Sequence, residues 1–458
     1  MSDKADAQFR IGEAAWVVIL MSVCFGFSYL DRNVLTILTQ PIKHSLSLSD
    51  TQLGVLGGFA FSVFFFLGGL PLAWLIDRTN RIRLTAACIF IWSVATVMSG
   101  LSTGFTQLLV SRAFTAAAEA ALIPAGLSIF ADMLPVRRIP LASSVLMIGG
   151  FVGGGAALYL GGTFLTYFSS PEAPHWFLPQ LLPWQHVYLV IGLAGIVPVA
   201  LLLLTTKEPA RREILDVDKE VNENAPPIRE VFSYLFVESG FYAPFILGVC
   251  AIFLVFYSVN AWFPAFLIRR FALSASEAGT YLGPAFIVFG IAGSLGSQLF
   301  LRRLTPDNIV PRIVLLLGGI CLVQIANLAA LPFATSPSIA VCVYGIAVGV
   351  TGAVLSVMLV PIQLTVPNRM RGQTMSIAYC GVNLLGTGLG PFLVGFLNER
   401  LFGGGATLGM CMAAISVSSA TVATILFARS YFVFTRQRIA AKPTEIVTSG
   451  AQQASISS

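Results

Sequence analysis

Charged side chains are scarce in this chain. Asp, Glu, Lys and Arg make up 10% of its 458 residues, whereas soluble domains carry about 25%. Hydrophobic residues reach 56%. The shortage of charge excludes an ordinary soluble enzyme and favours a membrane protein.

Residues that build catalytic and metal sites are also few. There are 3 His and 7 Cys, the cysteines fall in apolar stretches, and none forms a Cys-x-x-Cys pair. No Gly-rich phosphate loop is present, which argues against ATP-driven pumping. We therefore expect no enzyme, no metal site and no cofactor, and we interpret the cysteines as small buried hydrophobes.

Long apolar runs, in contrast, are abundant. Runs of about 18 or more apolar residues are typical of transmembrane helices. We find twelve, which predict an all-α membrane protein whose first span is retained rather than removed as a signal peptide. They lie at about residues 15–41, 53–76, 84–101, 106–133, 140–167, 186–205, 241–268, 277–301, 311–331, 337–364, 374–398 and 406–428.

Lys and Arg are distributed unequally between the two sides of the predicted bundle. Outside the spans, most of them fall on the side of the N-terminus, and the exceptions are Lys43, Arg269, Arg270 and Arg400. Because positive loops stay in the cytoplasm, both termini are predicted to be cytoplasmic, in a cell inner (plasma) membrane. The net charge of +6 is therefore interpreted as a topology signal and not as a nucleic-acid footprint.

The chain contains an internal repeat. Residues 53–78 align without gaps on residues 278–303, with 9 identities in 26 positions, and residues 138–162 match residues 371–395 more sparsely. Parallel duplication of six-helix halves is a feature of secondary transporters, whose substrate site lies between the halves. We predict two pseudo-symmetric six-helix halves, at residues 1–205 and 241–430. A cytoplasmic linker at residues 206–240 joins them, and a cytoplasmic tail follows at residues 431–458.

Glycine is concentrated in the fifth and eleventh predicted spans. Small residues let helices approach closely in lipid, and Pro391 interrupts the hydrogen-bond ladder of its helix. We predict a bendable, close-packed seam between the halves at Gly153, Gly386, Gly390 and Pro391, with ordinary tight packing as the alternative.

Four charged residues lie deep inside predicted spans, well away from the span ends, where a central charge costs at least about 3 kcal/mol. Asp31 and Arg32 are in the first span, and Arg112 and Glu119 are in the fourth. A helical rise places Asp31 about 16 Å below the outer membrane face, between Arg112 at about 9 Å and Glu119 at about 20 Å. The economical arrangement pairs Asp31 with Arg112 and leaves Arg32 to face Glu119 or another neighbour.

This charged quartet predicts proton coupling. Burial favours a neutral carboxyl group and a nearby arginine favours the charged form, so a change of partner changes the affinity for protons. We predict that Asp31 or Glu119 takes up a proton and releases an arginine, and that Arg32 or Arg112 binds an anionic substrate group. A static ion-pair network between the first and fourth spans is the alternative.

The second half carries no clearly central charge. Its embedded polar groups are neutral, such as Asn260 in the seventh span, and that span is rich in aromatic residues such as Trp262. An ionic half that faces an apolar half suits an amphiphile, with its headgroup on the arginines and its tail along the aromatics. Asn260 and Trp262 are therefore candidate substrate-binding residues, with packing against lipid or other helices as the alternative.

Short motifs resemble those of a known superfamily. Residues 77–83 resemble the Asp-Arg-x-Gly-Arg motif of the major facilitator superfamily, with Asn80 in place of the turn glycine. Within that superfamily the chain is similar to the spinster family, at residues 29–32, 48–54 and 261–266 among others. The resemblance implies the major facilitator fold of twelve helices and transport by alternating access.

The same resemblance assigns a cytoplasmic gate to Asp77, Arg78 and Arg81. Asp77 is expected to clamp the halves together on the cytoplasmic side in the outward-open state, although a positive-inside anchor also accounts for the arginines. Spinster-like proteins are taken to move lysophospholipids or sphingoid lipids, some of them with proton coupling.

These features predict a monomeric, proton-coupled secondary transporter for an amphiphilic or lipid-like anionic solute. Its expected partners are membrane lipids, protons and that solute, without nucleic acid. One alternative is an organic-anion symporter whose arginines bind a carboxylate. Another is a non-transporting membrane receptor or a lipid scramblase.

Overall fold

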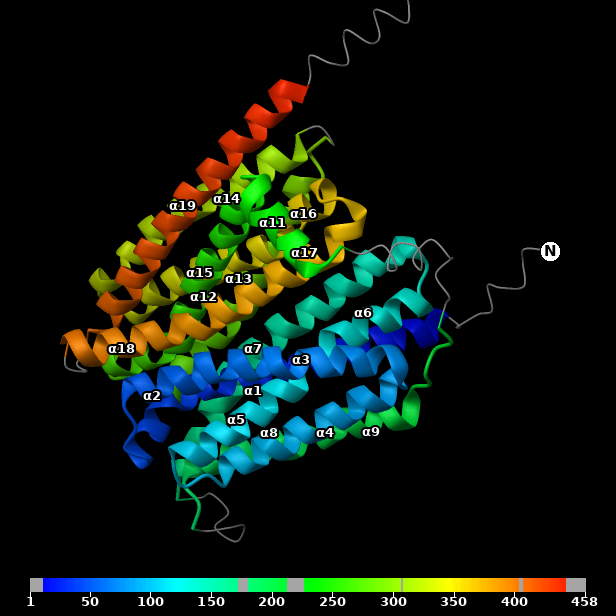
Figure 1. Ribbon diagram of the computed structural model, residues 1–458. Helices are drawn as coiled ribbons and strands as arrows, with labels where there is room; N and C mark the ends of the chain where they lie inside the picture. Colours follow the sequence, from blue (N-terminus) through cyan, green and yellow to red (C-terminus); the bar gives the residue numbers. More distant parts are fainter. Residues whose placement is uncertain (1–10, 172–179, 212–225, 306–307, 403–406, 442–458) are drawn as a thin grey trace, which may run out of the picture.

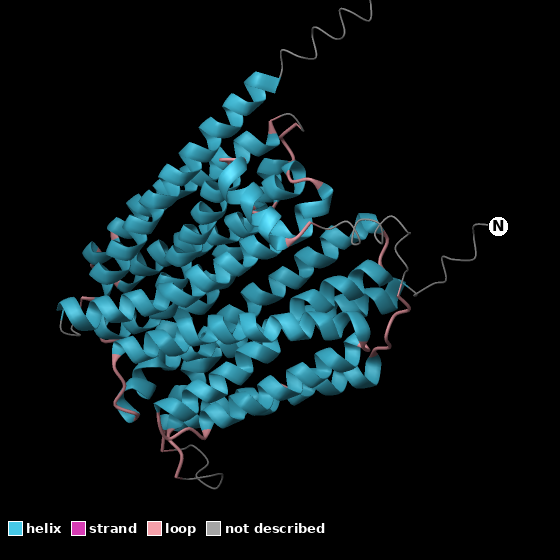
Figure 2. Cartoon of the chain, in the orientation of Figure 1, coloured by secondary structure: helices cyan, strands magenta, loops and turns pink. Residues whose placement is uncertain are grey.

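The computed structural model describes residues 11–171, 180–211, 226–305, 308–402 and 407–441. Within these ranges the regular structure is helical and no strand occurs (Figure 2). Twelve helices are long and apolar enough to cross a membrane. The predicted all-α membrane fold with twelve spans is therefore confirmed.

The first half packs its six spans beside the second half (Figure 1). We call the end of the bundle where α1 begins the terminal end, and the other the opposite end. The elements of the first half are α1 (Ile11–Ser45), α2 (Asp50–Gly54), η1 (Val55–Phe59), α3 (Ala60–Arg78), α4 (Arg81–Gly100), α5 (Phe105–Glu119), α6 (Leu122–Met133), η2 (Val136–Arg138), α7 (Ile139–Ser169), α8 (Pro183–Ala194) and α9 (Ile196–Thr205).

The second half begins with a short helix inside the predicted linker. Residues 212–225 of that linker lie outside the described residues. The elements are α11 (Ile228–Ser233), η3 (Tyr234–Glu238), α12 (Tyr242–Phe271), α13 (Ala275–Leu301), α14 (Ile309–Ala329), η4 (Leu331–Phe333), α15 (Pro337–Val357), α16 (Val360–Thr365), α17 (Asn368–Gly381), η5 (Val382–Leu389), α18 (Gly390–Phe402) and α19 (Leu408–Ala441).

The last helix extends beyond the predicted start of the tail, and the tail itself stays a prediction. Helix α19 continues through residue 430 to Ala441, and residues 442–458 lie outside the described residues. The apolar run of the twelfth span ends before its helix does, so hydropathy marks the end of the membrane stretch rather than the end of the helix.

Proline explains where some spans break. A proline has no N–H to donate to the carbonyl group four residues earlier. The fourth span is interrupted at Ala120 and Ala121, just before Pro124, so that Glu119 becomes the last residue of α5. The sixth span breaks at Gly195 ahead of Pro198 in the same way.

Two π-helical turns face one another across the halves. η1 lies in the second span and η5 lies in the eleventh, and they are in contact. A Cβ atom on Gly58 would lie 2.8 Å from the carbonyl oxygens of both Thr387 and Gly388, so only glycine allows this backbone approach. Such π turns are rare and frequently mark functional sites.

The fifth span, α7, packs closely against α13 of the other half. A Cβ atom on Gly155 would lie 2.5 Å from the Gly283 carbonyl oxygen, and one on Gly162 would lie 2.4 Å from the Ala275 carbonyl oxygen. Small residues therefore let these two helices cross in contact, as is common in membrane proteins.

The predicted glycine seam stays a prediction, and the contacts of its residues differ from one to the next. Gly153 packs on Gly26 of α1, and Gly386 and Gly390 pack on α12, so these three residues lie within their own halves. Of the four predicted seam residues, Pro391 does contact the other half, because its carbonyl oxygen lies against Gly54. Residue spacing identifies a glycine face but not the helix that will cover it.

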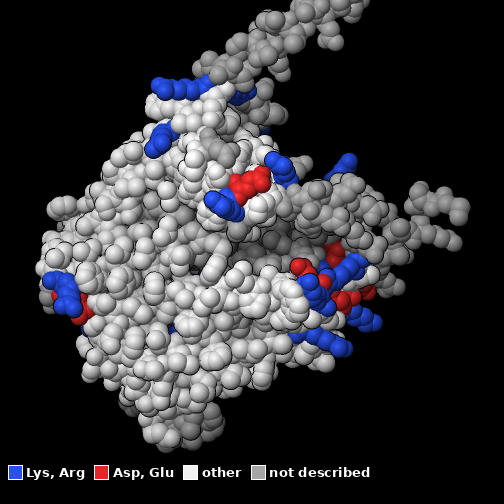
Figure 3. All heavy atoms as spheres, in the orientation of Figure 1, with Lys and Arg blue, Asp and Glu red and all other residues white. Residues whose placement is uncertain are grey.

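The apolar core is joined at one end and divided at the other. One cluster combines both halves, including Leu38 and Trp184 of the first with Trp262 and Phe286 of the second. Two further clusters each belong to a single half, towards the terminal end. Figure 3 shows the surface hollowed between the halves on that side. The structure is thus closed at the opposite end and open at the terminal end.

Candidate functional site

Asp31 is held by three polar contacts in the middle of the first half. The Thr96 hydroxyl group donates to Oδ1 at 2.6 Å, and Arg112 Nη1 lies 3.3 Å from Oδ2 and 3.4 Å from the Asp31 carbonyl oxygen. Asp31 and Arg112 are both buried. This ion pair between the first and fourth spans is the pairing that the sequence predicts.

Glu119 pairs with Arg32 but is only half satisfied. Arg32 Nη2 donates to Glu119 Oε2 at 2.8 Å, and the Ser28 hydroxyl group donates to the same oxygen at 2.9 Å. The second carboxyl oxygen, Oε1, is buried and has no partner. A buried acceptor without a donor costs about 1–3 kcal/mol, so this carboxyl group is the less secured of the two.

Phe61 separates the two arginines. Its ring centroid lies 4.4 Å from Arg32 Cζ and 5.5 Å from Arg112 Cζ, and the Arg32 guanidinium also contacts the rings of Tyr29 and Phe65. Cation–π contacts of this kind contribute about 0.5–2 kcal/mol each. Sequence reasoning missed Phe61, because five phenylalanines fall within residues 59–66 and nothing in their spacing separates this one.

Arg32 faces a cavity between the halves. Its side chain retains 15% exposure although α1 is surrounded by other helices. Tyr29 beside it, and Tyr257 and Tyr379 from the second half, are partly buried and interact electrostatically with it or with one another. One arginine and three phenol groups, drawn from both halves, thus lie near one another. Tyr257 is one of the aromatic residues of the seventh span that the sequence suggests for a substrate tail, and Tyr29 lies in the motif that resembles the spinster family, whereas the sequence analysis did not single out Tyr379.

Asn260 belongs to a hydrogen-bond chain that crosses between the halves. Its Nδ2 donates to Asn33 Oδ1 at 2.8 Å, and the Tyr344 hydroxyl group donates to its Oδ1 at 2.9 Å. All three lie next to the joined part of the core. Asn260 is therefore engaged by protein groups in this state.

Trp262 lies at the closed end, away from the quartet's ion pairs. Its indole N–H donates to the Pro391 carbonyl oxygen at 2.8 Å, and its side chain is buried. Phe253, Phe256, Phe263 and Phe266 of the same helix are buried as well. The predicted aromatic track for a substrate tail along the seventh span is not open in this structure, because these rings fill the core.

A second ionic cluster, centred on buried Asp50, ties the halves together at the opposite end. Arg269 of α12 donates to both carboxyl oxygens of Asp50, at 2.9 and 2.8 Å, and Asn398 of α18 donates at 2.7 Å. Lys43 completes the cluster at 2.5 Å. Opening of this end requires these bonds to break. The sequence analysis gave Asp50 no such role.

The predicted gate residues lie at the terminal end. Buried Arg81 is paired with Asp132 and, at 2.7 Å, with Glu208 at the start of the linker. The Asp77 carbonyl oxygen accepts from Arg211, and Arg78 lies 4.4 Å from the Trp74 ring. These contacts stay within the first half and the start of the linker. A clamp between the halves in an outward-open state remains a prediction.

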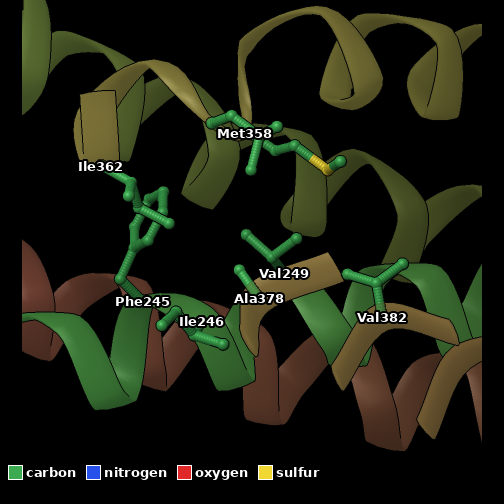
Figure 4. A pocket seen from close by; sticks show the side chains of 8 residues that line it. Phe245, Ile246, Val249, Met358, Ile362, Ala378 and Val382 are labelled. Atoms are coloured by element: carbon green, nitrogen blue, oxygen red, sulfur yellow. The ribbon is translucent and has the colours of Figure 1, made fainter. Parts of the chain in front are cut away.

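A small void in the second half is not a candidate site. It measures about 10 Å³ and is enclosed by apolar side chains such as Phe245, Met358 and Val382 (Figure 4). A space of that size holds one water at most, and an apolar lining offers that water no partners.

Twelve spans in two halves, with buried ion pairs beside a cavity open to one end, define a secondary membrane transporter. The comparison with known families agrees. The chain belongs to the Major Facilitator Superfamily, whose family model matches residues 21–391. It is therefore a multi-pass membrane transporter and not an enzyme.

Relatives of known or assigned activity are distant. An MFS-type efflux pump of Mycolicibacterium smegmatis is 27% identical over 403 residues, which cover 84% of this chain and 85% of the pump. A probable galactarate/D-glucarate transporter of Escherichia coli is 24% identical over 335 residues, covering 68% and 71% of the two chains.

The solved structures include a bacterial homolog of the human lysosomal transporter Spinster, in an inward-facing and unoccupied conformation. It is 26% identical, with a TM-score of 0.74 over 93% of this chain and 97% of that one. The resemblance to spinster-like transporters is thereby confirmed.

Proposed function

We propose that this chain is a proton-coupled transporter of an organic anion, working by alternating access in a bacterial inner membrane. The bias of Lys and Arg towards the terminal end supports cytoplasmic termini. With that orientation the cavity faces the cytoplasm, and the Asp50 cluster closes the outer side.

The position of Arg32 carries this proposal. Its side chain is 15% exposed and lies near Tyr29, Tyr257 and Tyr379. A guanidinium binds carboxylates through two parallel hydrogen bonds, and phenol groups can donate to the same oxyanion. This site fits a carboxylate substrate, with groups from both halves around it.

Glu119 supplies the coupling step. Proton transfer to its carboxylate neutralises the group and removes the charge attraction to Arg32. Arg32 stays charged and becomes free to bind the substrate anion. Proton and anion then bind together, and release of either favours return of the Arg32–Glu119 pair. Asp31 stays paired with Arg112 during the whole transport cycle. This division of tasks explains why the two ion pairs differ, whereas a static network does not.

The site also indicates the class of anion. A compact organic acid fits best, because Phe253, Phe256, Phe263 and Phe266 of α12 are buried and unavailable to a long tail. This leaves the partly buried Tyr257 as the aromatic residue of that helix near Arg32. The named substrates of the Escherichia coli relative, galactarate and D-glucarate, are acids of this kind. The amphiphile alternative is supported by Phe65, beside Arg32, and by the likeness to the Spinster homolog.

A binding screen tests the site. Purified protein is titrated calorimetrically with aliphatic and aromatic carboxylates and, separately, with lysophospholipids. We expect carboxylates to bind. Arg32→Lys should weaken that binding at least about tenfold, because a lysine ammonium group cannot make the two parallel hydrogen bonds of a guanidinium. Arg303→Lys, on an exposed arginine at the terminal end, should match the wild type.

Two outcomes would change the assignment. Binding of lysophospholipids alone would favour the amphiphile alternative. Carboxylate binding that Arg32→Lys leaves unchanged would remove Arg32 from the substrate site. A scramblase would instead show lipid mixing in vesicles without any solute or proton gradient.

A further inference from the structure

A groove runs between α4 and α5 on the outside of the first half. Its volume is about 560 Å³, within the range of about 300–1,000 Å³ typical of small-molecule sites. It is separate from the transport cavity. Its lining residues are mostly apolar, and none carries a charge.

The groove is continuous with the surface that faces the bilayer. Met98 and Phe114 on its walls are 54% and 60% exposed, whereas Ala95 and Ser111 on its floor are each 5% exposed. Both helices are membrane spans. Large exposed apolar walls around a recessed floor, at that depth, can be covered only by lipid or by another protein.

The length of the groove matches one leaflet. It extends from Phe90 to Leu101 along α4, which is about 16 Å of helix. Half of a hydrocarbon core about 30 Å thick is about 15 Å. The groove therefore reaches from the middle of the membrane to its face at the opposite end.

The two ends of the groove differ in polarity. At the membrane face, exposed Gln107 accepts hydrogen bonds from the Thr103 backbone N–H at 2.8 Å and from the Thr103 hydroxyl group at 3.0 Å. These bonds engage its oxygen and leave its amide N–H groups to donate outward. Towards the middle of the membrane, the groove is lined by the apolar rings of Phe90 and Phe114.

From this geometry we propose that the groove binds one acyl chain of a phospholipid of the leaflet at the opposite end, with the ester and headgroup region at Gln107. The absence of charge in its lining fits the chain rather than a charged substrate. This lipid site is independent of the transport site, and neither proposal depends on the other.

Bound lipid would stabilise the packing of α4 against α5, the two helices that form the groove. The Ser99 hydroxyl group donates to the Ser111 hydroxyl oxygen at 2.9 Å and joins α4 to α5. The residues next to the groove floor, Thr96 and Arg112, both hold Asp31. An acyl chain against this wall fills the space between the two helices that position the Asp31 pair.

Native mass spectrometry tests the proposal. The protein is reconstituted with phosphatidylcholine, extracted into mild detergent and weighed. We expect one tightly bound phosphatidylcholine on the wild type that Ala95→Phe removes, because a phenyl ring fills the groove. Val197→Phe, at a lipid-facing position on α9 that is 57% exposed, is the matched control and should keep it.

A second variant protects the test against a folding defect. Met98→Gln keeps the size of an exposed side chain but places an amide in the apolar wall, and we expect at least threefold lower occupancy. Retained lipid that is equal in the wild type, Ala95→Phe and Met98→Gln would overturn the proposal. So would an absence of retained lipid, or a dimer that Ala95→Phe dissociates, since a second copy would then cover the groove.

Discussion

At the scale of residues, the four intramembrane charges form two unequal pairs. The Asp31 carboxylate has a donor on each of its two oxygens, and Asp31 is buried together with Arg112. Glu119 concentrates both of its bonds on one oxygen, while its partner Arg32 reaches the cavity. We therefore assign a structural task to the first pair and the proton-dependent task to the second.

Substitution should separate these tasks. Removal of one partner from a buried ion pair costs about 3–5 kcal/mol, so Asp31→Asn should lower the melting temperature clearly because Arg112 loses its counter-charge. Glu119→Gln should melt close to the wild type, because its partner Arg32 can reach solvent in the cavity.

The pH dependence of anion binding distinguishes the same two variants. Affinity of the wild type should increase as pH falls, since protonation of Glu119 frees Arg32, whereas Glu119→Gln should bind with an affinity that pH hardly changes. Titrations at several pH values check this. Equal pH dependence in Glu119→Gln and the wild type would assign the proton to another group.

At the scale of elements, glycine faces set how closely the halves meet. Gly283 and Gly296 lie on the same helix, α13, in different surroundings. A Cβ atom at Gly283 would lie 2.8 Å from the Gly155 carbonyl oxygen and 2.9 Å from Tyr159 Cβ, whereas Gly296 has nothing within 4 Å. The two positions form a matched pair for testing the contact between α7 and α13.

Gly283→Ala should destabilise the protein by about 1–3 kcal/mol through overpacking. Gly296→Ala should be neutral or stabilising, because alanine is favoured over glycine in a helix by up to about 1 kcal/mol. Thermal unfolding in detergent measures both variants. Equal melting temperatures would show that the halves are not held by this contact.

The elements also show how far sequence reasoning reaches. The spans and the Asp31–Arg112 pair are predictable, because hydrocarbon thickness fixes span length and helical rise fixes depth. The partners of Gly153 and the roles of Phe61 and Tyr379 are not. Depth along a helix is encoded locally, but the direction in which a side chain points depends on tertiary packing.

At the scale of the whole molecule, the structure is one of two states that alternating access requires. The core and the Asp50 cluster close the opposite end, and the terminal end is open. In the other state the Asp50–Arg269 bonds must break and the terminal ends of the two halves must meet. In the present state Arg81, at the terminal end, pairs within the first half. In the proposed mechanism, a proton bound at Glu119 would lie between these two ends and bias the exchange.

The most direct test of this account is uphill transport in proteoliposomes. A carboxylate found by the binding screen is supplied at equal concentration on both sides, and a proton gradient is imposed. The account predicts accumulation on the side to which protons flow, its loss with a protonophore, and none in Glu119→Gln, which still exchanges anion for anion. Accumulation that does not depend on the proton gradient, or that persists in Glu119→Gln, would contradict proton coupling through Glu119.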